Sequence, residues 1–186
     1  MGRIRKILNA IEESGMPPIF APVMEMLNNL IKEKLVSDYV IGGSLSIMYY
    51  SEPFYTEDVD IFCYLPSQGK LFTLGPIWKY LESQGCKSDG GYMVIRGVKV
   101  QFLPPSGPLE EEAMATARVI KLGAVPAKIF ELEYAIAIKV SVGRTKDWLQ
   151  IETAKESANI NMNKLESILK KFNLLDKWVK HNARFQ

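Results

Sequence analysis

Cysteine and histidine are scarce in this sequence. Its 186 residues include 2 cysteines, Cys63 and Cys86, and 1 histidine. Two cysteines are too few for a disulfide framework, and their spacing does not match a zinc site. Cys63 lies in an apolar run, where it is most simply a small core residue. These counts predict a reduced, cytoplasmic protein.

Long hydrophobic runs and a strong net charge are also missing. No stretch approaches the roughly 18 consecutive apolar residues of a transmembrane helix, so we expect no membrane partner. The N-terminal stretch has no continuous apolar core and no small-residue cleavage site, which argues against a signal peptide. The formal net charge of +2 gives no global indication of nucleic-acid binding. Basic residues gather over 164–184, either as solvated helix faces, the simpler interpretation, or as an RNA- or phosphate-facing surface.

What the chain does contain is 47% hydrophobic residues, arranged in alternating strand and helix periods. We expect helices over residues 3–13, 21–35, 44–50, 71–83, 108–117, 129–142, 146–157, 163–172 and 173–181. We expect strands over residues 39–41, 59–65 and 119–125, and a hairpin over 92–103 that turns at Arg96-Gly97. The pattern predicts an α/β (α+β) fold, with a short mixed sheet in residues 1–126 and a helical subdomain packed on it in residues 127–186.

Two aspartates, Asp58 and Asp60, interrupt the apolar run that forms the second expected strand. Side chains alternate along a strand, so both carboxylates point to one face and Val59 and Ile61 point to the core. Two neighbouring carboxylates repel each other, and a divalent cation such as Mg²⁺ relieves the repulsion. A solvent-facing edge strand is the plainer alternative for an isolated pair of this kind.

The turn Gly42-Gly43-Ser44 lies upstream of the aspartates, between an expected strand and an expected helix. Backbone N–H groups at a helix start bind anions, and glycine lets the backbone approach a phosphate closely. A phosphate-binding turn followed by a carboxylate pair is what a nucleoside triphosphate with Mg²⁺ requires. Their order and spacing therefore favour a nucleotide site over an isolated edge-strand pair.

Together these motifs resemble the signature of the DNA polymerase β-like nucleotidyltransferase superfamily. Gly43-Ser44 is followed, after 13 intervening residues, by Asp58-Val59-Asp60-Ile61. The stretch "EYAIAIKVSVGRTKDWLQI" at 133–151 is similar to the helix–turn–helix of minimal bacterial and archaeal members. The resemblance spans about 40–152, and the nearest branch is that of abortive-infection and toxin–antitoxin nucleotidyltransferases.

The resemblance implies a short mixed sheet flanked by helices, with a C-terminal helical subdomain. It implies transfer of a nucleoside monophosphate from a triphosphate to a hydroxyl or phosphate of RNA, protein or a small molecule, with an antitoxin as a further partner. It implies that Asp58 and Asp60 are catalytic and hold Mg²⁺ or Mn²⁺. Gly42, Gly43 and Ser44 would hold the triphosphate.

One position departs from the family pattern. Members usually carry a third carboxylate on a later strand, and the matching residue here is Gln101. A neutral amide is a weak ligand and a poor general base. Three interpretations remain open: another acid substitutes, the protein binds a nucleotide but reacts slowly, or it is a non-catalytic nucleotide- or RNA-binding member. The candidate substitutes are Asp89, Glu110, Glu111 and Asp147.

Three basic residues follow in the expected helix–turn–helix. Lys139 interrupts a buried-looking helix, so it needs an anion, either an acid such as Asp147 or Glu133 or a bound triphosphate. Arg144 and Lys146 follow the turn and suit phosphate contacts, arginine through its bidentate fork. The sequence therefore supports a metal-dependent nucleotidyltransferase first, a binding module on the same fold second, and a purely structural domain third.

Overall fold

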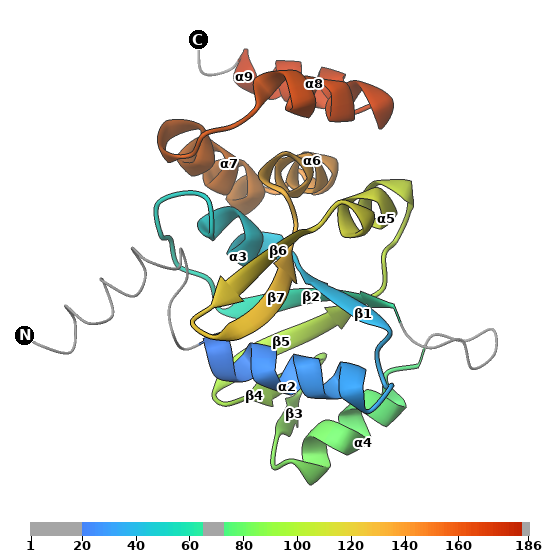
Figure 1. Cartoon of the computed structure of the whole chain (residues 1–186). Coiled ribbons are helices and arrows are strands. Elements are labelled where there is room, and N and C mark those ends of the chain that lie inside the picture. The colour runs from blue at the N-terminus through green and yellow to red at the C-terminus, as the bar shows by residue number, and fades with distance from the viewer. Residues whose placement is uncertain (1–19, 65–72, 184–186) are drawn as a thin grey trace, which may run out of the picture.

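The computed structural model describes residues 20–64 and 73–183. The helix expected over 3–13 lies outside these residues. Within them, seven strands form one mixed sheet in the order β3-β4-β5-β2-β1-β7-β6 (Figure 1). The strands are β1 (Asp38–Ile41), β2 (Asp58–Tyr64), β3 (Lys87–Asp89), β4 (Tyr92–Ile95), β5 (Val98–Leu103), β6 (Arg118–Leu122) and β7 (Val125–Ile129). The helices are α2 (Ala21–Lys32), α3 (Gly43–Met48), α4 (Gly75–Ser83), α5 (Pro108–Ala115), α6 (Leu132–Val142), α7 (Thr145–Ser157), α8 (Met162–Lys171) and α9 (Leu175–Asn182).

Strand β2 lies in the middle of the sheet, antiparallel to β1 and parallel to β5. The register places Asp60 beside Gln101 and Asp58 beside Lys99. Strands β4 and β5 form the expected hairpin, and Arg96 and Gly97 both have positive φ values, 52° and 84°, as a two-residue type I′ turn requires. The central position of β2 brings residues from the rest of the chain to the aspartates.

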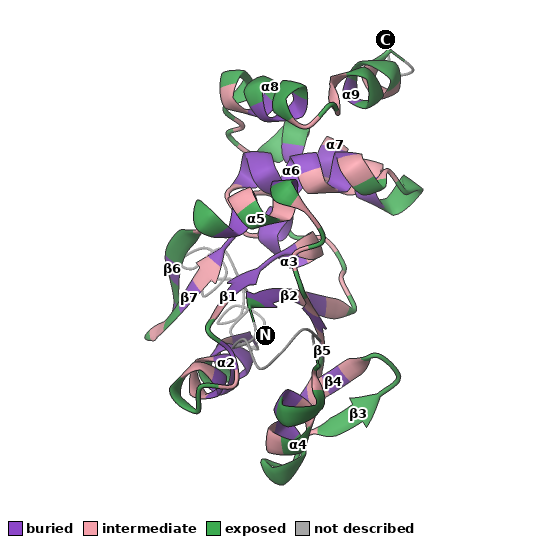
Figure 2. Ribbon diagram, turned by 90° about the vertical axis from the view of Figure 1, so that its right-hand side faces the viewer, coloured by how far each residue is buried: buried purple, intermediate pink, exposed green. Residues whose placement is uncertain are grey.

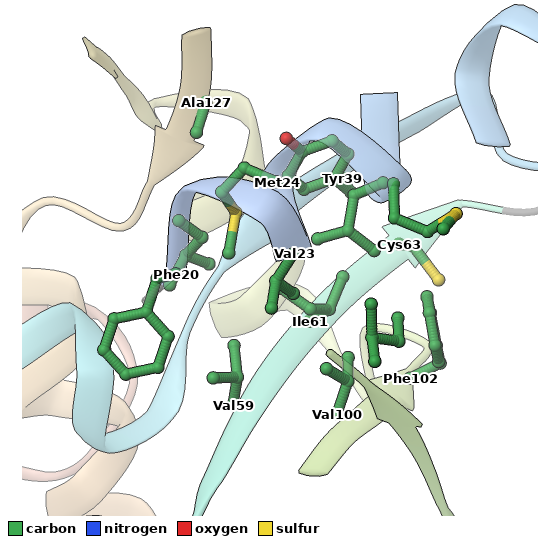
Figure 3. Close-up of a cluster of buried hydrophobic side chains, with 14 of the residues drawn as sticks. Phe20, Val23, Met24, Tyr39, Val59, Ile61, Cys63, Val100, Phe102 and Ala127 are labelled. Atoms are coloured by element: carbon green, nitrogen blue, oxygen red, sulfur yellow. The ribbon is translucent and has the colours of Figure 1, made fainter. Parts of the chain in front are cut away.

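Helices cover both faces of the sheet (Figure 1). Helices α2 and α4 pack on one face, where Val59, Ile61 and Cys63 of β2 join a buried cluster with Val23 of α2 (Figure 3). Helices α3, α5 and α6 lie on the other face, α7 lies beside α6, and α8 and α9 lie farther from the sheet, beyond α6 and α7 (Figures 1 and 2). The predicted alternation along β2 is therefore confirmed, because the aspartates lie on the face opposite Val59 and Ile61.

Helix α6 is the centre of the second layer and is buried on nearly all sides (Figure 2). It contacts α3, α5, α7, α8 and α9. A helix surrounded in this way has apolar residues all round rather than one apolar stripe. Lys139 is consequently one of the few charged side chains within this layer.

The sequence analysis missed two strands. β3 is only three residues long and fully exposed, so it has no apolar alternation to reveal it. β7 contains Pro126, which weakened the strand pattern, and the helix expected from residue 129 begins instead at Leu132. The boundary expected between 126 and 127 falls inside β7, so the sheet takes its last strand partly from residues assigned to the helical subdomain.

Three of the five lysines described between residues 164 and 183 have acidic partners. Lys164 lies 2.6 Å from Glu131, Lys170 lies 2.5 Å from Glu166, and Lys171 pairs with Glu112. These pairs favour solvated, internally balanced helix faces over an RNA-binding surface. None of the helices in the described part of the chain is both long and apolar enough to span a membrane.

Candidate active site

A cavity of about 360 Å³ opens on the second face of the sheet, where β2 and β5 meet α3, α5, α6 and α7. This volume lies within the range of small-molecule sites. Nine of the lining residues carry charged or polar groups that the sequence analysis singled out. They are Ser44, Asp58, Asp60, Gln101, Glu110, Lys139, Arg144, Lys146 and Asp147.

Asp58 and Asp60 supply the acidic wall of the cavity. Both are partly buried, and no described residue forms an ion pair with either carboxylate. Burial raises the pKa of Asp60, and the neighbouring charge of Asp58 raises it further. Cationic side chains on α6 and α7 act in the opposite direction. The pair is thus the kind of crowded anionic site that a bound cation stabilises.

The turn before α3 is built against the second aspartate. Gly43 has φ +56°, and a Cβ placed there would lie 1.9 Å from Oδ2 of Asp60. Gly42 packs against two aromatic rings. A Cβ placed at Gly42 would lie 2.5 Å from the ring of Phe62 and 2.8 Å from the ring of Phe130. Both glycines are therefore required by close packing, and Gly43 also by its backbone conformation.

The three residues of this turn have different environments. Gly43 and Ser44 line the cavity, whereas Gly42 is buried behind it. The N–H of Gly42 donates to the Asp60 carbonyl oxygen at 2.9 Å, and the Ser44 hydroxyl donates to Oε1 of Gln150 at 3.1 Å. The N–H groups of a first helical turn have no carbonyl partner within the helix. The groups available to a ligand in the cavity are accordingly those of Gly43 and Ser44.

Lys139 finds its anion inside the protein. Its Nζ lies 3.2 Å from Oδ1 of Asp147, and both side chains are buried. The left-handed Gly143, with φ +75°, ends α6 and turns the chain sharply into α7, which brings the first turn of α7 back against the end of α6. Lys139 therefore has an acidic partner, Asp147, and it lines the cavity as well.

Asp147 also holds Arg144. Its Oδ2 accepts hydrogen bonds from the Arg144 Nε at 2.8 Å and the Arg144 N–H at 3.2 Å. Burial tends to raise the pKa of Asp147, but the hydrogen bonds from Arg144 and the charge of Lys139 outweigh it, so the pKa is lowered. Burial lowers the pKa of Lys139 against the opposing effect of Asp147. Asp147 therefore stays ionised and fixes two cations at the cavity wall.

Lys146 and Gln101 complete the polar lining. Lys146 is exposed and has no ion-pair partner among the described residues. Gln101 lies beside Asp60 on the neighbouring parallel strand and faces the same cavity. The resemblance to the nucleotidyltransferase pattern predicts a third carboxylate at this position, and that assignment stays a prediction.

The four acids that were candidates to replace that carboxylate differ in whether they line the cavity and in whether they already form ion pairs. Asp89 pairs with Lys99 at 2.8 Å, and neither Asp89 nor Glu111 is among the cavity-lining residues. Asp147 lines the cavity but is committed to its two cations. Glu110 is the fourth, and it lines the cavity from the first turn of α5.

Comparisons with known proteins rest on structure alone. No protein-family model matches the chain, and no curated protein matches it. It is similar to the crystal structure of an antigenic nucleotidyltransferase-like protein from Paracoccidioides brasiliensis, with a TM-score of 0.56 and 17% identity over 87% of this chain and 89% of the other. The chain has a nucleotidyltransferase-like fold.

The antibiotic-resistance factor ANT(2'')-Ia is also similar. Its solution structure gives a TM-score of 0.50 at 14% identity, covering 87% of this chain and 95% of the other. Its crystal structure in complex with adenylyl-2''-tobramycin gives 0.50 at 14% identity, covering 81% and 95%. At identities this low, the structural similarity establishes a shared nucleotidyltransferase-like fold and nothing about the reaction. The chemistry of this chain has to be argued from its own residues.

On this nucleotidyltransferase-like fold, the donor set suits a hard divalent cation. Asp58 and Asp60 offer carboxylate oxygens, and Gln101 adds an amide oxygen beside them. Oxygen donors of this kind are the ligands of Mg²⁺ and Mn²⁺. Within residues 20–64 and 73–183, no three acidic, histidine or cysteine side chains cluster closely enough to hold a metal together. The protein thus supplies two carboxylates. This donor set fits a metal ion whose remaining coordination positions are filled by substrate and water.

Proposed function

We propose that the protein binds a nucleoside triphosphate with Mg²⁺ or Mn²⁺ in this cavity and transfers the nucleoside monophosphate to an acceptor, releasing pyrophosphate. The observation that carries the proposal is the presence of Asp58 and Asp60 on one wall of a cavity whose other walls hold Lys139, Arg144 and Lys146. A triphosphate needs cations around its oxygens, and its metal needs carboxylates. This cavity offers both.

The chain's own cations bind and orient the triphosphate. Lys146 is exposed and unpaired among the described residues, so it can turn toward phosphate oxygens at small cost. Arg144 uses Nε and one terminal nitrogen on Asp147, which leaves other N–H donors of its fork for a phosphate. The N–H groups of Gly43 and Ser44 add neutral donors at the same wall.

The metal would be held by Asp58 and Asp60, with Gln101 beside them. When bound, it neutralises charge on the phosphate oxygens and polarises the phosphorus under attack. No lysine or arginine of the described residues forms an ion pair with either carboxylate, although the charges of Lys139, Lys146 and Arg144 act on Asp60. The binding of cation and triphosphate together therefore relieves a repulsion that the fold maintains.

The acceptor is proposed as a hydroxyl or phosphate group of RNA, protein or a small molecule. The crystal structure of ANT(2'')-Ia with adenylyl-2''-tobramycin shows that a similar fold accommodates a nucleotidylated small molecule. Membership of the toxin–antitoxin branch, an antitoxin partner and a cytoplasmic location remain predictions from the sequence.

A second candidate is nucleotide or RNA binding without turnover. The neutral Gln101 beside Asp60 favours it, because an amide cannot take a proton from an acceptor hydroxyl. The two candidates share the cavity and the binding step. They differ only in whether another group takes the role of the missing carboxylate.

Calorimetric titration with each nucleoside triphosphate, with and without Mg²⁺, tests the binding step. We expect metal-dependent binding that Asp58→Asn weakens by at least about 10-fold, since loss of metal-site groups costs affinity on this scale. Asp176→Asn, an exposed acid on α9, is the matched control and should bind like wild type. Absence of nucleotide binding, or equal binding by Asp58→Asn, contradicts the proposal.

Transfer of label from an α-labelled triphosphate then separates the two candidates. Wild-type protein is incubated with Mg²⁺ and with RNA, protein and small-molecule fractions in turn. Labelled product from one fraction supports transfer, and its loss in Asp58→Asn assigns the reaction to this cavity. Tight metal-dependent binding with no labelled product in any fraction supports the binding module.

A further inference from the structure

Four carboxylates line the cavity, and three of them have a role already. Asp58 and Asp60 form the pair on β2, and Asp147 is committed to Lys139 and Arg144. The remaining one is Glu110. The sequence left four acids open as replacements for the missing third carboxylate, and the fold removes all but this one.

Glu110 lies close along the chain to the strand that lacks the carboxylate. β5, which carries Gln101, ends at Leu103, and α5 begins at Pro108, so Glu110 is in the first turn of the helix that follows. The side chain is partly buried and lines the same cavity as Gln101. The partial positive charge at a helix N-terminus favours an ionised carboxylate there.

The two neighbouring glutamates are placed differently. Glu111 is exposed and does not line the cavity. Glu112 accepts a hydrogen bond from the Tyr134 hydroxyl at 2.8 Å and pairs with Lys171, which ties α5 to α6 and α8. Among the described residues, none forms a hydrogen bond or ion pair with the Glu110 carboxylate. Of the three, Glu110 is the one that is both in the cavity and available.

Glu110 does not join the aspartates as a third metal ligand. No three acidic side chains of the described residues lie within metal-binding distance of one another, although Asp58, Asp60 and Glu110 line one cavity. Glu110 therefore lines the cavity without belonging to the carboxylate pair on β2. A carboxylate of this kind can accept a proton from a group bound in the cavity.

We propose that Glu110 is the general base of the transfer reaction, an inference that rests on the function proposed above. The Glu110 carboxylate takes the proton of the acceptor hydroxyl as that oxygen forms a bond to the α-phosphorus. The bond from this phosphorus to the leaving group breaks, and its electron pair leaves with pyrophosphate. Gln101 has no basic group for this step, so the proton acceptor comes from α5 rather than from β5.

The test compares Glu110→Gln with its neighbour Glu111→Gln, using Mg²⁺, ATP and molar glycerol as a generic hydroxyl acceptor. Nucleotide affinity is measured by calorimetry and turnover by pyrophosphate release. We expect Glu110→Gln to lose about 10²–10⁴-fold in turnover, the usual contribution of a general base, with unchanged nucleotide Kd. Glu111→Gln should match wild type, and Glu110→Asp, which keeps the carboxylate, should retain part of the rate. Thermal unfolding confirms that each variant is folded.

The outcomes separate this inference from the proposed function. If wild type binds nucleotide and releases pyrophosphate but Glu110→Gln does so equally fast, the base is another group and the inference is wrong. It is also wrong if the nucleotide Kd of Glu110→Gln rises as its turnover falls, because the residue then acts in binding. If wild type binds nucleotide but releases no pyrophosphate, no transfer takes place and the assignment of Glu110 as general base is wrong. If wild type does not bind at all, the proposed function itself fails.

Discussion

Asp60→Asn should make the metal-free protein more stable. The two aspartates are two residues apart on one face of β2, so their Cα atoms lie about 6.6 Å apart at the usual rise per residue. Two unit charges at that separation repel by about 0.6 kcal/mol in water and about 2.5 kcal/mol at an effective dielectric constant of about 20. The cations on α6 and α7 offset part of this repulsion. We therefore expect the amide, which has the same shape, to raise the free energy of unfolding by about 1 kcal/mol.

The assay is thermal unfolding in the presence of a chelator. For a chain of this size, about 1 kcal/mol corresponds to a rise in Tm of roughly 2–4 °C. With Mg²⁺ and a nucleotide at about 100 times the wild-type Kd, wild type should gain about 2.7 kcal/mol, whereas Asp60→Asn, with an affinity at least about 10-fold lower, should gain at most about 1.4 kcal/mol. The reasoning is refuted if Asp60→Asn is less stable than wild type in chelator, or if the ligand stabilises both proteins equally.

Three other predictions concern single sites. Asp147→Ala leaves the buried Lys139 without its partner and should lower the free energy of unfolding, measured in urea, by about 3–5 kcal/mol. A decrease below about 1 kcal/mol would show that the Asp147 ion pairs do not stabilise the fold. Because the pKa of Asp147 is lowered in the folded protein, its stabilisation is present above about pH 3.9 and lost at lower pH, so the acid-induced loss of stability should be smaller in the variant. Gly43→Ala should displace the Asp60 carboxylate and weaken metal-dependent nucleotide binding, whereas Gly97→Ala, also at positive φ but with open space, should not. Burial raises the pKa of Cys63 to about 12, so a thiol reagent should label it only after unfolding, and labelling in the native protein would show that β2 opens.

The parts of the fold that the sequence predicted best are those governed by short-range rules. Alternation along β2 assigned Asp58 and Asp60 to one face, and the two-residue Arg96-Gly97 turn identified the hairpin. Both depend on residues adjacent in the chain. The nucleotidyltransferase-like fold followed from such local motifs together, before any long-range contact was known.

The remaining errors and open choices concern contacts between distant segments. β7 was missed because Pro126 breaks the strand pattern. The segment is a strand because it pairs with β6 and β1, and those pairings cannot be seen in its local sequence. The partner of Lys139 was undecided because Asp147 lies on the next helix, and only the turn at Gly143 brings the two together. The choice among four acids required knowing which of them reach the cavity, and periodicity cannot tell where a first helical turn points.

The turn at Gly42 has a consequence for when the site forms during synthesis. Strand β1, which leads into this turn, is anchored by the N–H of Phe130, which donates to the Ile41 carbonyl oxygen at 3.0 Å. The first residues of α3 are anchored by the Ser44 hydroxyl, which donates to the side chain of Gln150. A ribosome that has translated both aspartates still has to add about ninety residues before these anchors exist. The newly made segment that ends with β2 therefore carries the acidic pair without the cations and the rigid turn that organise it. Nucleotide binding should begin only after α7 has emerged, so any transfer activity requires translation through α7.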